Sequence, residues 1–246
     1  MDGHLKPVAL GGKLSTISLS ATQAAALRRA LNGDAADYVY SGVVSIGDAV
    51  QAIDRSLFTW ATVKLYYAVF YMTRALLAAR GTAIFYVGTK PYSWACIAGA
   101  MAVKREGPTH KVVLASFEAV LPNSPLLSQP IGLDGALDWL MKRREEANYS
   151  NPRFSEPGAP AHLDLIARTG VRKSVSAYLR DDKYLYAFDP QHAMLAFPIE
   201  ALKMIFRPKA IGGVGIALSG DDRKYLASLY ADKSGPLAEV VSLILA

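Results

Sequence analysis

The stretch ATVKLYYAVFYMTRALLAA, residues 61–79, decides the fold class of this chain. Its apolar residues recur at steps of three and four, which is the spacing of one face of an α-helix. The members of this face are Ala61, Leu65, Ala68, Val69, Met72, Leu76 and Ala79. No proline lies between Ile46 and Arg80, and Gly81 follows as a helix stop. The pattern predicts a long amphipathic helix, with a break allowed between Asp54 and Trp60 because such a length is unusual.

Four further helices are predicted in the first 150 or so residues from capping residues and helix breakers. They comprise a helix capped by Ser20 and stopped at Gly33, SWACIAGAMAVKR capped by Ser93, HKVVLASFEAVL capped by Thr109, and GALDWLMKRREEANYS capped by Asp134. Asn151-Pro152 ends the last of these, because proline disfavours helical geometry in the residue before it. The fold class is therefore mainly α.

The segment SEPGAPA, residues 155–161, has the composition of a linker. It divides the chain into an N-terminal helical bundle, residues 1–154, and a C-terminal helical subdomain, residues 162–246, which we expect to pack together. In the second part we expect a helix over Leu163–Leu179 and helices beginning near Pro198, Ser219 and Gly235. One short β-hairpin is a further expectation, because KYLYAF and HAMLAF suit extended structure and flank Asp189-Pro190.

Composition and charge narrow the class of protein. The chain has 246 residues, 52% of them hydrophobic, which is enough for a sizeable core. The single cysteine, Cys96, cannot form an intramolecular disulfide, and we expect a cytoplasmic protein with no secretory signal. The longest uncharged apolar run is about ten residues, short of the ~20 that span a bilayer, so no membrane association is expected. A net charge of +6 is consistent with two alternatives: a polyanionic partner, or a basic surface with no such partner.

Several segments resemble HEPN-domain proteins in order and spacing. They are KLYYAVFYMTRALLAARG, GPTHKVVLASFEA and KRREEANYSNP, and FPIEALKMIF with GDDRKYLASLYADKSGPLAEVVSLIL is similar to the YaaC-like branch of that superfamily. The resemblance implies an antiparallel HEPN-like bundle with a C-terminal extension, and a protein that binds or cleaves RNA. It also implies a homodimer, and a place in a toxin, anti-phage defence or other multi-component system.

The HEPN signature is an arginine followed, after four to six residues, by a histidine. In this chain Arg144 is followed by Tyr149 at that place. Such a pair serves metal-free RNA cleavage, because a base takes the ribose 2′-hydroxyl proton while a guanidinium neutralises the phosphate. Tyrosine, with a usual pKa near ~10, is a weaker base at neutral pH than histidine, near ~6.5. His110, which opens the helix after Thr109, is a candidate to supply the base.

The resemblance therefore implies catalytic roles for Arg144, Tyr149 and His110, and we expect Lys142, Arg143 and Asn148 to contact RNA. Three interpretations of this helix end stay open. It is a solvated face with Tyr149 packed inward, an RNA-binding surface without cleavage, or a metal-independent endoribonuclease. A catalytically inactive scaffold that binds a protein partner is the alternative function. No metal-ligand spacing occurs, so we expect no metal and no cofactor.

Overall fold

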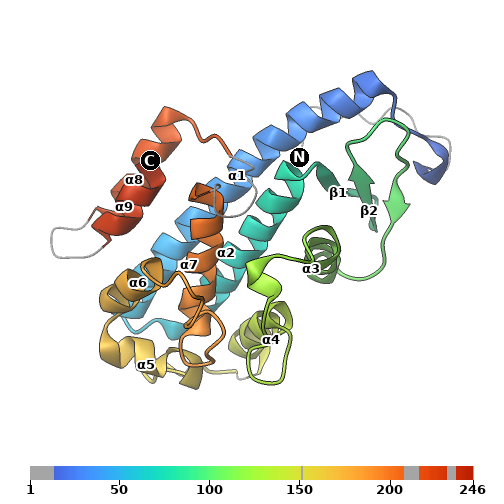
Figure 1. The fold of residues 1–246 in the computed structure, drawn as a ribbon. Coiled ribbons are helices and arrows are strands. Elements are labelled where there is room, and N and C mark those ends of the chain that lie inside the picture. Colours follow the sequence, from blue (N-terminus) through green and yellow to red (C-terminus); the bar gives the residue numbers. More distant parts are fainter. Residues whose placement is uncertain (1–13, 151, 208–215, 232–236, 246) are drawn as a thin grey trace.

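The computed structural model describes residues 14–150, 152–207, 216–231 and 237–245, and within them the chain is mainly helical (Figure 1). The longest elements, α1 (Ala21–Asp54) and α2 (Phe58–Ala79), form an antiparallel pair. The predicted break is confirmed: Ser56, at φ 57°, turns the chain between them. The predicted stop at Gly33 is wrong, because α1 continues through it. Its apolar face on both sides of Gly33 packs into the core, which outweighs the glycine's low helix propensity.

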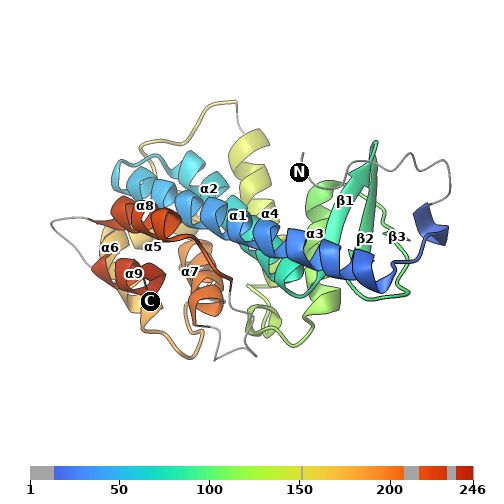
Figure 2. The same ribbon diagram turned by 90° about the horizontal axis from the view of Figure 1, so that it is seen from above.

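A small antiparallel sheet follows α2. It consists of β1 (Thr82–Val87), β2 (Lys90–Ala95) and β3 (Val103–Lys104) in the order β1-β2-β3. The helix that was predicted after Ser93 is therefore wrong, since Ser93 pairs with Ile84 in the sheet. The aromatic and branched side chains of β1 suit a strand, and pairing with them overrides the helix propensity of the segment that follows. The sheet lies at one end of α1 (Figure 2).

The predicted helices before and after the linker are largely confirmed. They are α3 (Thr109–Val120), α4 (Ala136–Tyr149), α5 (Ala161–Thr169) and α6 (Val171–Leu179). One helix was expected over the last two, and Gly170, at φ 95°, divides it. Short 3-10 turns occur at η1 (Leu14–Thr16) and η2 (Pro125–Leu127).

The β-hairpin that was predicted around Asp189-Pro190 is wrong. Most of HAMLAF belongs to α7 (Ala193–Phe206), in which every residue from Ala193 to Ile205 is buried. A helix buried on all sides is apolar all round, so short apolar runs within it mimic a strand. Helix α8 (Gly220–Tyr230) begins after Ser219 as predicted, and α9 (Ala238–Leu245) follows, while Gly235 lies outside the described residues.

One hydrophobic core connects these elements, with α2 packed against α1, α3, α4 and α7. The linker-like segment takes part in this packing. The Glu156 carboxylate accepts hydrogen bonds from the Thr59 backbone amide, at 2.7 Å, and from the Thr59 hydroxyl, at 2.9 Å. It therefore caps the free amides at the start of α2, where a negative charge is favourable. In the described parts of the chain, no helix has the length and apolarity needed to cross a membrane.

Candidate functional site

The basic run Lys142–Arg143–Arg144 lies on α4, but its cations have different surroundings. Lys142 pairs with Asp134. Arg143 pairs with Glu146 at 2.6 Å, and its guanidinium carbon lies 5.3 Å from the centre of the Trp139 ring. Each of these two cations is thus paired with a carboxylate of the same chain.

Arg144 faces a different set of neighbours. Its guanidinium carbon lies 5.7 Å from the centre of the Tyr66 ring, 5.9 Å from that of Tyr67 and 5.8 Å from that of Tyr149. A guanidinium over aromatic faces is held by cation–π attraction while its positive charge stays uncompensated. Among the residues that the structure describes, Arg144 forms no ion pair with a carboxylate. It is therefore the cation of this run that has no carboxylate partner within the described residues.

The side-chain chemistry of Arg144 favours the charged form. Partial burial opposes the charge, but a hydrogen bond with Tyr67 and the nearby phenols raise the pKa of the guanidinium above its usual value. Arg144 Nε is buried and has no hydrogen-bond partner within the described residues. The group is thus a fixed, half-buried cation whose position is set by tyrosines rather than by acids.

His110, at the start of α3, lies against the same tyrosines. Its Nδ1 is 2.8 Å from the Tyr66 hydroxyl oxygen, and its ring centre is 4.6 Å from that of Phe70 and 5.7 Å from that of Tyr67. Burial lowers the pKa of His110, and the charge of Arg144 lowers it further against a smaller opposing effect of Glu145. The imidazole is therefore neutral at pH 7, the form in which it can accept a proton.

The last two predicted residues lie at the end of α4. Tyr149 is 75% exposed, so the expectation that its ring packs inward is wrong. Asn148 is half-buried, one helical turn after Arg144 on the same side of the helix. The structure thus brings Arg144 and His110 against Tyr66 and Tyr67, places the exposed Tyr149 ring beside the Arg144 guanidinium, and places Lys142 and Arg143 in ion pairs.

Tyr66 and Tyr67, which contact Arg144 and His110, were not among the candidate site residues predicted from the sequence. Tyr66 and Phe70 are buried, whereas Tyr67 and Tyr71 are half-buried. Their apolar spacing on α2 matches the core pattern, so periodicity alone does not separate them. Adjacency does not separate them either, because the neighbouring residues Leu65 and Tyr66 point about 100° apart and are both buried.

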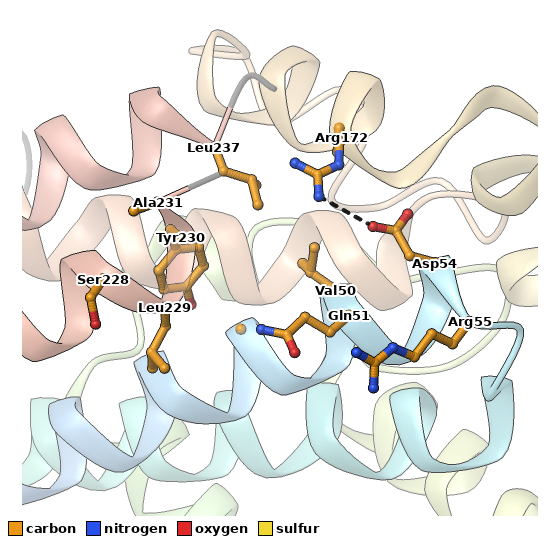
Figure 3. Close-up of a pocket in the computed structure, with 11 residues that line it drawn as sticks. Val50, Gln51, Asp54, Arg55, Arg172, Ser228, Leu229, Tyr230, Ala231 and Leu237 are labelled. Atoms are coloured by element: carbon orange, nitrogen blue, oxygen red, sulfur yellow. Dashed lines mark ion pairs between the residues drawn. The ribbon is translucent and has the colours of Figure 1, made fainter. Parts of the chain in front are cut away.

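A separate hollow of about 410 Å³ lies between α1, α6 and α8 (Figure 3). Arg172 and Asp54 project into it from opposite sides and form an ion pair at 3.5 Å. Tyr230 forms part of its wall, and its hydroxyl donates to the Val43 carbonyl oxygen at 2.5 Å. The hollow shares no lining residue with the Arg144 cluster, and its central arginine already has a carboxylate partner.

Within the described residues, no group of three or more His, Cys, Asp or Glu side chains has the arrangement of a metal site. Comparison with protein-family models, with curated proteins and with solved structures finds no match for this chain.

Proposed function

We propose that this protein is a HEPN-like RNA-binding protein that holds a phosphate of the RNA at Arg144. The observation that carries the proposal is the position of Arg144 over three tyrosine rings, with no carboxylate partner in the part of the chain that the structure describes, while Lys142 and Arg143 beside it are paired with acids. A guanidinium binds phosphate by charge-assisted hydrogen bonds, and the half-buried setting of Arg144 strengthens them.

The test measures RNA binding by the wild-type protein and by the Arg144→Ala and Arg143→Ala variants, using the fluorescence anisotropy of a labelled RNA. The two variants remove the same charge from adjacent positions of one helix, so the net charge of the protein is matched. We expect Arg144→Ala to weaken binding roughly tenfold and Arg143→Ala to change it less than about threefold. Equal effects of the two variants, or no RNA binding by the wild type, would contradict the proposal.

RNA cleavage is a second candidate function, because His110 shares its tyrosine neighbours with Arg144 and has a lowered pKa. In the tautomer whose Nδ1–H donates to Tyr66, Nε2 carries the free lone pair. Nε2 would take the proton of a ribose 2′-hydroxyl, and the resulting oxygen would attack the adjacent phosphorus. The bond from phosphorus to the 5′-oxygen would break, leaving a 2′,3′-cyclic phosphate and a 5′-hydroxyl protonated by water or by Tyr149.

Arg144 would neutralise the charge that develops on the phosphate in this reaction. The signature of the mechanism is a 2′,3′-cyclic phosphate product formed in the presence of a metal chelator. Intact RNA after prolonged incubation with binding-competent protein would exclude cleavage and leave the RNA-binding proposal in place.

A further inference from the structure

A stripe of partly exposed side chains follows one face of α2 next to Arg144. It consists of Trp60, Lys64, Tyr67 and Tyr71, which recur at steps of four, three and four and therefore share a face. Trp60 is 50% exposed, and Tyr67 and Tyr71 are half-buried. The stripe spans about 16 Å along the helix axis, at about 1.5 Å per residue. We call these four residues the α2 stripe.

Exposed aromatic rings gather at the Trp60 end of the stripe. Phe154, 48% exposed, packs edge-on against Trp60 with ring centres 5.9 Å apart. At the Arg144 end, the exposed ring of Tyr149 lies beside the guanidinium, which also contacts Tyr67 of the stripe. Large aromatic side chains that remain exposed near a cation are the usual components of a surface on which nucleic-acid bases stack.

The charges near the stripe limit what it can bind. Lys64 pairs with Asp48 at 3.0 Å, so the stripe itself adds little positive charge. Arg74, the next residue on the same side of α2, lies 4.3 Å from the centre of the Tyr38 ring. Both Arg144 and Arg74 are held over aromatic rings, so attraction for a polyanion on this side of α2 comes from these two cations, while the stripe offers ring faces. A duplex buries its bases within the stack and presents mainly phosphates, which such a surface contacts poorly.

We infer that the RNA bound by this protein is single-stranded, with one phosphate on Arg144 and neighbouring bases stacked on Trp60, Tyr67 and Tyr71. This inference rests on the proposed function, because it takes the phosphate position from Arg144. Stacking on aromatic rings is tolerant of sequence, so the ligand is a single-stranded segment of any sequence rather than a particular motif.

Tryptophan fluorescence offers a direct experiment. The chain has three tryptophans. Trp139 is buried, Trp94 donates its ring N–H to the Ala100 carbonyl oxygen at 3.0 Å, and Trp60 is the most exposed of the three. A short RNA strand of mixed sequence is titrated into the protein, first alone and then annealed to its complement. We expect the single strand to quench the emission of Trp60 and to bind at least tenfold more tightly than the duplex.

Variants of the stripe separate the possible results. Trp60→Leu should abolish the quench and weaken single-strand binding by about tenfold, whereas Tyr86→Leu, a matched change of an exposed ring on β1, should leave both unchanged. Anisotropy of a labelled strand measures the affinity of Trp60→Leu, and circular dichroism verifies its fold.

If single and double strands bind equally and Trp60→Leu has no effect, this inference is wrong, while a continued requirement for Arg144 preserves the proposed function. A protein that binds neither form contradicts both. If Trp60→Leu instead converts a dimer into a monomer with unchanged RNA affinity, a second copy of the chain covers the stripe and the inference is overturned.

Discussion

His110 and His162 both lie against α2, and each shares a hydrogen bond with a hydroxyl group of that helix. His110 Nδ1 is 2.8 Å from the Tyr66 hydroxyl oxygen, and His162 Nε2 is 2.9 Å from the Thr62 hydroxyl oxygen. Thr62 and Tyr66 are one helical turn apart, so the two pairs are near-repeats of one arrangement. They differ in what surrounds them.

His162 is enclosed. It is 9% exposed, and its ring lies edge-on to the Trp139 ring with the ring centres 6.3 Å apart. Burial is the larger cause, and the charge of Arg143 the smaller, that together lower the pKa of His162 to about 4. His110 is only half-buried and has the uncompensated Arg144 as its neighbour. The same histidine–hydroxyl pair thus stabilises the fold where it is closed, and is available to a ligand where it is open. The predictions below test that division.

The largest expected effect is on the rate of RNA cleavage, the second candidate function. His110→Ala removes the proposed base and should lower the rate of RNA cleavage by roughly 10²- to 10⁴-fold. The rate of formation of the 2′,3′-cyclic phosphate under a chelator, at saturating protein, measures it. His162→Ala, assayed at a temperature at which it is folded, should retain a rate near that of the wild type. Similar losses in the two variants would erase the functional difference between the histidines.

Stability should respond in the opposite order. His162→Ala removes a buried ring and leaves the Thr62 hydroxyl without its partner, so we expect a loss of about 3 kcal/mol in the free energy of unfolding. His110→Ala should lose less than about 1.5 kcal/mol because water reaches the vacated position. Urea denaturation of both variants provides the measurement, and a larger loss for His110→Ala would reverse the assignment.

Acid should destabilise the fold through His162. Its folded-state pKa of about 4 is below the ordinary value of 6.5, so the unfolded chain binds the proton more strongly. The contribution of the neutral His162 to the free energy of unfolding is fully present above pH 6.5 and is lost as the pH decreases toward 4. Between pH 7 and pH 5 we expect a loss of about 2 kcal/mol from this group. Urea denaturation at both pH values should show it in the wild type, and a His162→Leu variant with the same pH dependence would refute it.

The smallest effects come from removing the hydroxyl partners. Thr62→Val leaves a buried imidazole nitrogen unpaired and should cost about 1 to 2 kcal/mol of unfolding free energy. Tyr66→Phe should cost less than about 1 kcal/mol, because His110 can hydrogen-bond to water instead. Thermal unfolding of the two variants in parallel gives the comparison. Equal losses of unfolding free energy in the two variants would mean that water reaches the two histidines equally.

The sequence predicted the parts of this molecule that depend on local pattern. The repeat of apolar residues located α2, and Ser20 and Ser219 located the starts of α1 and α8. The small sheet was missed, because pairing of β1 with β2 depends on contacts between segments rather than on either segment alone. The fully buried α7 was partly mistaken for a strand for a related reason, since complete burial removes the periodic signal.

For the candidate site, the sequence proposed residues but not the side chains that they contact. Arg144, Tyr149 and His110 were chosen from the sequence; the structure places Arg144 and His110 against Tyr66 and Tyr67, and Tyr149 against Arg144. The pairing of Arg143 with Glu146 and of Lys142 with Asp134 depends on rotamers and on a loop, neither of which spacing specifies. It is this pairing that distinguishes Arg144 from its neighbours.

The salt dependence of RNA binding tests most directly whether Arg144 contacts phosphate. The logarithm of the binding constant falls linearly with the logarithm of the salt concentration, and each lost phosphate contact reduces the slope by about one. We predict that Arg144→Gln reduces the slope by about one, while Arg143→Gln leaves it unchanged. A slope that is the same in the wild type and in Arg144→Gln would contradict the account.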